Sequence, residues 1–207
     1  MHRCARTPVA LFYNDLYEVP LPPTHRFPMD KYREVRLALE RELGPSGSAL
    51  FYPSPLATLD ELTTVHTTEY VNKYLRGELS EKENRRTGFP WSPEAVNRSL
   101  SSIGGTIAAM RTVCRAEPGG VRFAGHLAGG THHAFADRGE GYCVFNDIAV
   151  AAKLALSECE GVERILIIDL DVHQGNGNAH LFRDEPRVFT FSMHCEKNLF
   201  SARQAPQ

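Results

Sequence analysis

The chain has 207 residues, of which 42% are hydrophobic and 23% charged, and its formal net charge is −2. A chain of this length buries enough apolar surface for a core without disulfides, and its nearly balanced charge gives no basic surface for nucleic acid. The longest apolar runs, such as residues 9–13, contain only five residues, whereas a membrane-spanning helix needs about 18 or more. We therefore expect a single globular domain over residues 1–207, without a membrane span or direct nucleic-acid binding.

The cysteines indicate a reduced protein. There are five of them, Cys4, Cys114, Cys143, Cys159 and Cys195, at wide spacings and without a C-x-x-C pair. This pattern is unlike a disulfide framework or a thiolate zinc site. We therefore expect an intracellular protein, located in the cytoplasm, the nucleus or an organelle. Cys143 is interpreted as a small, half-buried thiol and not as a nucleophile.

Hydrophobic periodicity and capping residues predict strands that alternate with helices. In chain order, the predicted strands cover residues 9–13, 49–52, 121–124, 164–170 and 188–192. The predicted helices cover residues 30–43, 58–75, 92–117, 145–160 and 178–183. Residues 19–28, rich in proline, and residues 125–141, rich in glycine and histidine, are expected to be loops. The charged residues 78–86 are expected to be exposed.

The strand predicted at residues 164–170 indicates the type of sheet. Its sequence is R-I-L-I-I-D-L, with a continuous apolar run. Such a run is typical of a parallel strand that is buried on both faces. Strands alternating with helices therefore predict an α/β fold, in which helices cover both faces of a parallel sheet.

Polar residues follow three of the predicted strands, at the carboxyl ends where open α/β sheets bind ligands. These segments are residues 128–133, 169–175 and 192–194. Asp169, Asp171 and His173 are spaced by two residues, so they share one face of an extended segment. Two carboxylates beside an apolar strand repel each other unless a cation binds them, so the spacing predicts a metal site. A solvated turn is the alternative, but it does not explain why His173 is spaced to lie on the same face as both aspartates.

The adjacent residues His132 and His133 follow two glycines. Because imidazole titrates near neutral pH, a tandem pair at a strand end predicts catalytic acid/base chemistry. Gly141 and Tyr142 follow closely and indicate a flexible approach with an aromatic wall, with a simple core position for Tyr142 as the alternative.

A dinucleotide-binding site is the other motif to consider. Gly175 and Gly177 follow a predicted strand, as in such a site, but His180 occupies the position of the third glycine. The sequence therefore argues against this reading.

Together these segments resemble the zinc-dependent histone deacetylase superfamily. The matching segments are G-G-T-H-H-A at residues 129–134, G-E-G-Y-C-V-F-N-D-I-A at residues 139–149 and I-D-L-D-V-H-Q-G-N-G at residues 168–177. Residues 25–29 and 88–92 resemble its class IV-like and bacterial-type branch. The resemblance covers nearly the whole chain. It implies the arginase/deacetylase α/β fold, with a parallel sheet flanked by helices on both faces.

The resemblance also implies roles for residues. Asp171 and His173 match zinc ligands. His133 matches the general base that later acts as the acid, and His132 matches its electrostatic partner. Asp169 matches the carboxylate behind His132.

Further positions follow from the same resemblance. Asn176 lies where many relatives have an acid behind the second histidine, and an amide raises the histidine pKa less than a carboxylate does. Gly141 and Tyr142 match the wall of the acyl-lysine tunnel. A structural potassium site is matched by the backbone oxygens of Asp169, Asp171 and His173, together with Ser192 and Met193.

Two residues of the family pattern have no counterpart in this sequence. A third metal-ligand aspartate and a catalytic tyrosine follow the segment that matches residues 191–194, whereas Asp184, the last aspartate here, precedes it. The expectation is an incomplete deacetylase domain that lacks its C-terminal third. We expect the 207-residue chain to have no appreciable activity alone.

The predicted function is that of a zinc-dependent amidohydrolase. Its substrate would be acyl-lysine in a protein, or a related small N-acyl amine. Zinc polarises the amide carbonyl and lowers the pKa of its water, while histidine moves the protons. A non-catalytic remnant that binds a partner is the alternative. A manganese ureohydrolase of the same fold is disfavoured by the His132-His133 pair and by Gly-Tyr-Cys at residues 141–143.

Overall fold

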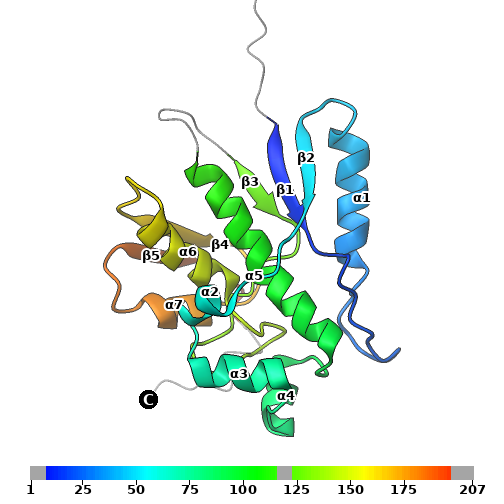
Figure 1. The fold of residues 1–207 in the computed structure, drawn as a ribbon, viewed down its shortest axis with the longest axis vertical. Coiled ribbons are helices and arrows are strands. Elements are labelled where there is room, and N and C mark those ends of the chain that lie inside the picture. The colour runs from blue at the N-terminus through cyan, green and yellow to red at the C-terminus, as the bar shows by residue number, and fades with distance from the viewer. Residues whose placement is uncertain (1–7, 116–122, 197–207) are drawn as a thin grey trace, which may run out of the picture.

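The computed structural model of the chain describes residues 8–115 and 123–196. Its strands are β1 (Val9–Tyr13), β2 (Ala49–Pro53), β3 (Ala124–His126), β4 (Ile165–Asp169) and β5 (Val188–Ser192). Its helices are α1 (Lys31–Leu43), α2 (Leu59–Thr63), α3 (Thr68–Arg76), α4 (Glu81–Thr87), α5 (Pro93–Cys114), α6 (Asp147–Glu158) and α7 (Asn176–Phe182). The predicted α/β class is confirmed (Figure 1). Over the described ranges, no helix has the length and apolarity needed to cross a bilayer.

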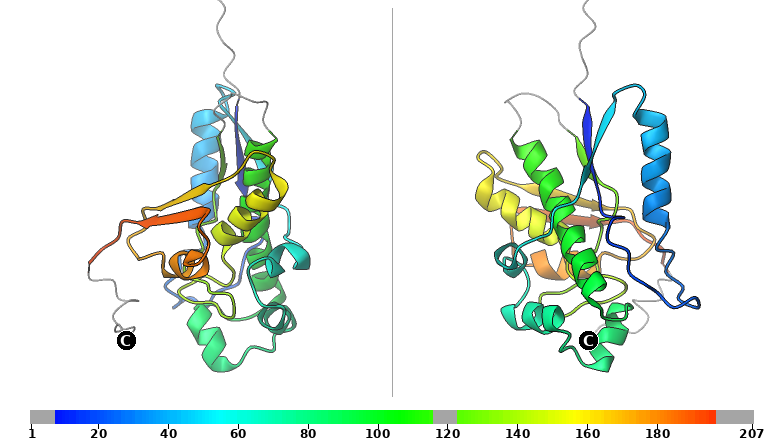
Figure 2. Two further views of the ribbon diagram at one scale, coloured as in Figure 1. Left: turned by 90° about the vertical axis from the view of Figure 1, so that its left-hand side faces the viewer. Right: turned by 45° about the vertical axis from the view of Figure 1, so that its right-hand side comes forward.

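The strands pair in parallel, as the sequence predicts, but the described residues form two sheets and not the single sheet expected. One has the order β2-β1-β3 and the other pairs β4 with β5. The first sheet lies between α1 and α5 (Figure 2). In the second sheet, Asp169 at the end of β4 is opposite Ser192 at the end of β5. This register brings two of the predicted polar segments to the same edge of the sheet.

The core is centred on α5 and α6, which pack side by side (Figure 1). Ile103 and Ile107 of α5 are buried together with Val150 of α6. The rings of Tyr70 and Tyr74, on α3, contact the ring of Phe145 edge-on, with centroids 5.6 and 5.3 Å apart. This packing fixes the start of α6 next to the loop that follows β3.

The single helix predicted over residues 58–75 is wrong, because two helices occupy this stretch. Thr58 forms a capping box with Glu61 at the start of α2. The Thr67 side chain accepts a hydrogen bond from the backbone N–H of Tyr70, and so begins a new helix, α3. Side-chain capping competes with helix continuation at threonine, which the periodicity of apolar residues does not reveal.

Other element boundaries differ by a few residues. The strand predicted at residues 121–124 begins at Ala124 and continues to His126, while residues 121 and 122 lie outside the described part. The helix predicted from residue 145 begins at Asp147, because the Asn146 side chain caps it by accepting from Ala149 N–H. The charged segment 78–86 is mostly exposed, as expected, and much of it forms α4.

The expectation that β4 is buried on both faces is wrong for the described structure. Ile167 is only 7% exposed and packs against Ala149 of α6 and Phe182 of α7. Its neighbours Leu166 and Ile168, which point to the opposite face, are 59% and 60% exposed. No element within residues 8–115 and 123–196 covers that face, which Phe189 of β5 extends.

Candidate active site

The loop after β3 carries the histidine pair, His132 and His133, and the N-terminus of α6 holds this loop in place. The Asp147 carboxylate accepts hydrogen bonds from the backbone N–H groups of Gly130, at 3.0 Å, and Thr131, at 2.7 Å. It also accepts from the Thr131 hydroxyl at 2.6 Å. A buried carboxylate with this many donors is well satisfied, so the loop has a fixed conformation next to the histidine pair.

Each ring of the histidine pair is oriented through its Nδ1 atom. Nδ1 of His132 lies 2.5 Å from Oδ2 of Asp169, and Nδ1 of His133 lies 2.6 Å from Oδ1 of Asn176. An oxygen acceptor at this position fixes the tautomer that carries its proton on Nδ1. The side-chain lone pair of each ring is therefore on Nε2. The rings are adjacent, with centroids 4.1 Å apart, and the two residues are only 6% and 3% exposed.

The environment of His133 favours its neutral form. Burial lowers the pKa of His133 below its ordinary value, and the nearby rings of His132 and His173 lower it further. The hydrogen bond to Asn176 opposes this shift only in part. A neutral imidazole at physiological pH is the form that accepts a proton.

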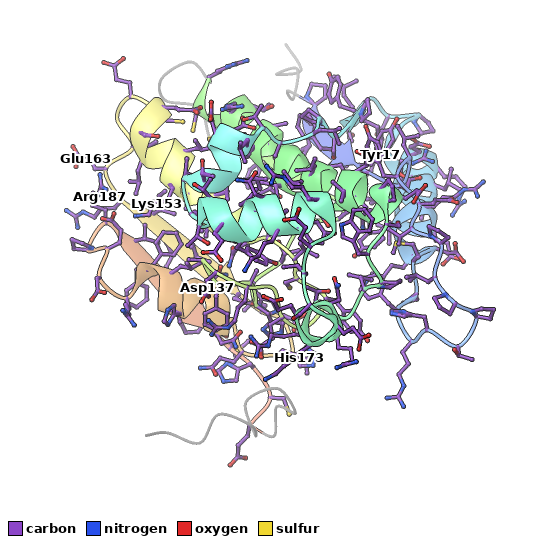
Figure 3. All side chains as sticks on the ribbon, turned by 60° about the horizontal axis from the view of Figure 1, so that its bottom comes forward. Tyr17, Asp137, Lys153, Glu163, His173 and Arg187 are labelled. Carbon is purple, nitrogen blue, oxygen red and sulfur yellow. The ribbon has the colours of Figure 1, made fainter. Side chains whose placement is uncertain are left out.

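Asp171 and His173, the predicted metal donors, lie at the rim of the same site. Oδ1 of Asp171 accepts from the backbone N–H of His173 at 2.7 Å and lies 3.0 Å from its Nδ1. The same oxygen is 3.8 Å from Nε2 of His132. Burial opposes ionisation of Asp171, but the hydrogen bonds from His173 and the electrostatic interaction with His132 hold the pKa of its carboxyl below the usual value. Figure 3 shows His173 at the outer edge of the molecule.

These donors fit zinc in type, since carboxylate oxygen and imidazole nitrogen are ordinary zinc ligands. They do not complete a catalytic site, which ordinarily has three protein ligands. Within the part of the chain that the structure describes, no three His, Cys, Asp or Glu residues are grouped to hold a metal ion. Asp171 and His173 thus match a partial set of ligands.

The residues matched to a potassium site lie close together at the ends of β4 and β5. The backbone carbonyl of Asp169 accepts from Met193 N–H at 3.0 Å. The Ser192 hydroxyl accepts from Gly175 N–H at 3.2 Å and lies 3.0 Å from Nδ1 of His194. The parallel register of the two strands produces this proximity.

A pocket of about 320 Å³ leads to the histidine pair. Its lining includes Phe27, Phe89 and Tyr142, whose ring centroids are 4.9 to 5.3 Å apart. Such contacts between aromatic rings are favourable beyond their burial of apolar area. The volume is at the lower end of the range typical of small-molecule sites, and the three rings give the pocket an apolar wall.

Tyr142 has an unusual backbone conformation. Its φ of 66° makes it the one non-glycine residue with positive φ in the described ranges, and such conformations cost energy unless the surroundings impose them. Here Gly141 N–H donates to the carbonyl of Arg86 at 3.1 Å, and Tyr142 N–H donates to that of Thr87 at 2.9 Å. The C-terminal end of α4 therefore fixes the position of the Tyr142 ring.

Two groups of pocket residues were not assigned to the site from the sequence. Phe27 and Phe89 each precede a proline within segments noted only for their resemblance to a branch of the family. Arg98 is buried on α5, with its guanidinium 4.2 Å from the centre of the Tyr32 ring. The sequence signal for Arg98 was its charge within a helix that has few other charged residues. A charge that is buried needs a compensating partner, so such a residue is a candidate for a site.

Cys143 is a poor candidate for a nucleophile, in agreement with its interpretation from the sequence. It is buried, and burial raises the pKa of its thiol to about 12. Its Sγ lies 3.6 Å from the carbonyl oxygen of Gly141. Because the thiolate is the reactive form, this thiol contributes packing to the pocket wall.

Comparison with known proteins places the chain in a family. Residues 25–206 match the histone deacetylase domain family. An uncharacterized protein of Picosynechococcus sp. is 44% identical over 192 residues, which are 93% of this chain and 62% of that protein. The acetoin utilization protein AcuC of Staphylococcus aureus is 31% identical, over 79% of this chain and 44% of that protein. Histone deacetylase 8 of Arabidopsis thaliana is 34% identical, over 67% of this chain and 36% of that protein.

A solved structure shows the same fold. The crystal structure of the HDA15 HD domain superposes with a TM-score of 0.74, covering 91% of this chain and 53% of that chain, at 22% identity. The chain therefore spans only part of the length of each of these relatives.

Proposed function

The chain belongs to the histone deacetylase domain family, and we propose that its domain hydrolyses the amide of acyl-lysine, or of a related N-acyl amine, with the help of zinc. The observation that carries this proposal is the position of the histidine pair. Both rings are buried, oriented through Nδ1, and located at the inner end of an aromatic pocket beside Asp171 and His173. An acyl-lysine side chain is long and apolar with an amide near its end, which suits a pocket lined by aromatic rings and by the histidine pair.

The chain's own residues support a general acid–base role for His133. Its Nδ1–H is held by Asn176, so Nε2 is the atom that takes a proton from the attacking water. The same atom then gives the proton to the departing amine nitrogen. His132, held by the Asp169 carboxylate, provides a second polarised imidazole within 4.1 Å, centroid to centroid.

Asp171 and His173 would hold the zinc, as two of its ligands. When bound there, zinc supplies the Lewis acidity that an unreactive amide carbonyl requires. Asp169, Asp171, His173, Ser192 and Met193 remain our candidates for a structural potassium site, on the basis of the proximity of β4 and β5.

We also propose that residues 1–207 by themselves do not turn over acyl-lysine appreciably. The described residues supply two zinc donors where catalytic zinc ordinarily has three. The open face of β4 and β5, which includes Leu166 and Phe189, also exposes apolar surface that favours association or aggregation. The competing reading is a module that binds a partner and has no activity.

A replacement protein separates these readings. In it, this chain takes the place of the matched region of the Picosynechococcus relative, which is 44% identical. We expect the replacement protein to hydrolyse an acyl-lysine peptide in the presence of zinc, and the 207-residue chain not to do so. If the unmodified relative is active and the replacement protein is not, the proposed activity is wrong.

A further inference from the structure

Three sulfur atoms lie near one another at the C-terminal ends of α5 and α6, on residues that are not part of the histidine loop. Sδ of Met110 lies 3.7 Å from Sγ of Cys114, one helical turn later on α5. The same Sδ lies 3.6 Å from Sγ of Cys159, the residue that ends α6. The two helices run side by side over this region (Figure 1).

Both thiols are free and half-buried. Sδ of Met110 is therefore the shared hydrogen-bond acceptor of the two thiols. Burial, together with the neighbouring Cys114, raises the pKa of Cys159 to about 12. Both observations describe a compact group of sulfur atoms that is reduced in the described structure.

We propose that Met110, Cys114 and Cys159 form a binding site for a soft monovalent cation, Cu(I). Thiolate and thioether sulfur are the ligands that select Cu(I) over harder metals. An ion at the centre of three sulfurs, with bonds near the ~2.3 Å of a zinc–thiolate bond, holds them about 4 Å apart. The distances from Met110 Sδ, 3.7 and 3.6 Å, require an expansion of only a few tenths of an ångström.

The nearby charged groups favour a sulfur-only site. Both carboxylate oxygens of Glu158 are hydrogen-bonded to Arg111, at 2.8 and 2.9 Å. Arg111 also binds Glu61 at 2.7 Å. Since these carboxylates are committed to the guanidinium, they are poorly placed to add the oxygen ligands that harder cations prefer.

Cu(I) bound at this site would link the C-terminal ends of α5 and α6. The opposite end of α6 carries Asp147, which holds the loop of the histidine pair. An ion that binds only the folded chain raises its stability by mass action. We therefore expect one equivalent of Cu(I) to raise the melting temperature of the reduced protein.

The test is an anaerobic titration of the reduced 207-residue chain with Cu(I), kept reduced by ascorbate, in competition with bathocuproine disulfonate. We expect one tightly bound ion. Loss of even an outer-shell partner weakens metal affinity by about 10- to 100-fold, so Cys114→Ser and Cys159→Ser should each weaken binding at least about tenfold. Met110→Leu should weaken it too. Cys195→Ser, which removes an exposed thiol, is the control and should bind like the wild type.

X-ray absorption of the wild-type complex makes the result independent of how the variants fold. We expect a shell of three sulfurs around copper. Nitrogen or oxygen ligands, no stoichiometric binding, or equal loss in Cys195→Ser would overturn the proposal. A Cys114–Cys159 disulfide that forms without retained Cu(I) would also overturn it.

Discussion

Nδ1 of His133 lies 2.6 Å from Oδ1 of Asn176, so an amide and not a carboxylate orients the candidate general base. The amide is itself fixed, because Oδ1 also accepts from Gly177 N–H at 3.0 Å. The neighbouring His132 is oriented by a carboxylate, that of Asp169. The two imidazoles therefore differ in the charge of the group behind them.

This difference predicts the effect of Asn176→Asp. A negative charge next to Nδ1 stabilises the imidazolium, so the pKa of His133 should rise by about 1 to 3 units. An NMR titration of the imidazole signals measures the change. Asn176→Gln, which keeps a neutral amide, is the matched control. An unchanged or lower pKa in Asn176→Asp would show that Asn176 does not set the electrostatics of His133.

Metal binding should depend on Asp171 and His173. Because catalytic zinc ordinarily has three protein ligands, Asp171→Ala or His173→Ala in the replacement protein should each abolish stoichiometric zinc binding. Metal analysis after dialysis measures it. His194→Ala is the control, since His194 contacts Ser192 and is not among the proposed ligands. Full zinc occupancy in both ligand variants would remove these residues from the site.

The stability of the fold should decrease as the pH falls from about 6.5 to 4. His66 is buried, and Nδ1 lies 2.9 Å from Phe135 O while Nε2 accepts from Asn146 N–H. Burial lowers the pKa of His66 from 6.5 to about 4. As the pH falls, His66 is therefore protonated in the unfolded chain before it is protonated in the folded chain. The contribution of His66 to the free energy of unfolding is complete above about pH 6.5 and is lost as the pH approaches 4.

The size of this effect follows from linkage. The difference between the pKa values of His66 in the unfolded and folded chains corresponds to roughly 3 kcal/mol of unfolding free energy. Urea unfolding of the wild type and of His66→Gln, at several pH values in this range, isolates the contribution. We expect a weaker pH dependence in His66→Gln, and parallel curves for the two proteins would contradict the assignment.

The close approach of α7 to the histidine loop makes Gly177 sensitive to substitution. A Cβ at this position would lie 2.5 Å from the carbonyl oxygens of both His132 and Ala134. Backbone atoms move only with the loop, so Gly177→Ala should destabilise the fold by about 1 to 3 kcal/mol. Chemical denaturation measures it.

A matched control is Gly47→Asn. Gly47 has open space around its Cβ position, and asparagine tolerates its φ of 64°. We expect this variant to stay within about 0.5 kcal/mol of the wild type. Equal stability of Gly177→Ala and the wild type would mean that the helix and the loop are not in rigid contact.

Much of the site could be predicted from the sequence because it depends on short-range spacing and on sheet geometry. The carboxyl-end rule indicated that the polar residues after β3 and β4 lie close together. The extended segment expected through His173 ends at Asp169, and residues 171–173 form a bend. The pairing of His132 with Asp169, 2.5 Å apart, was expected from the resemblance to the deacetylase family and not from these rules.

The aromatic pocket wall was only partly predictable. Phe27 and Phe89 come from segments far apart in the chain, and their contact with Tyr142 depends on how those segments pack. The hydrophobic periodicity of the sequence does not indicate such a contact. The exposed face of β4 was mispredicted for a related reason, since an apolar run shows what a strand can bury and not which element covers it.

The most direct measurement of the central claim is the turnover of an acyl-lysine peptide by the replacement protein, with and without His133→Ala. General acid–base catalysis is ordinarily worth about 10² to 10⁴ in rate, so the variant should lose turnover by this factor while zinc content stays near normal. Equal turnover in the two proteins, at equal zinc content, would contradict the account, because His133 would then move no proton in the reaction.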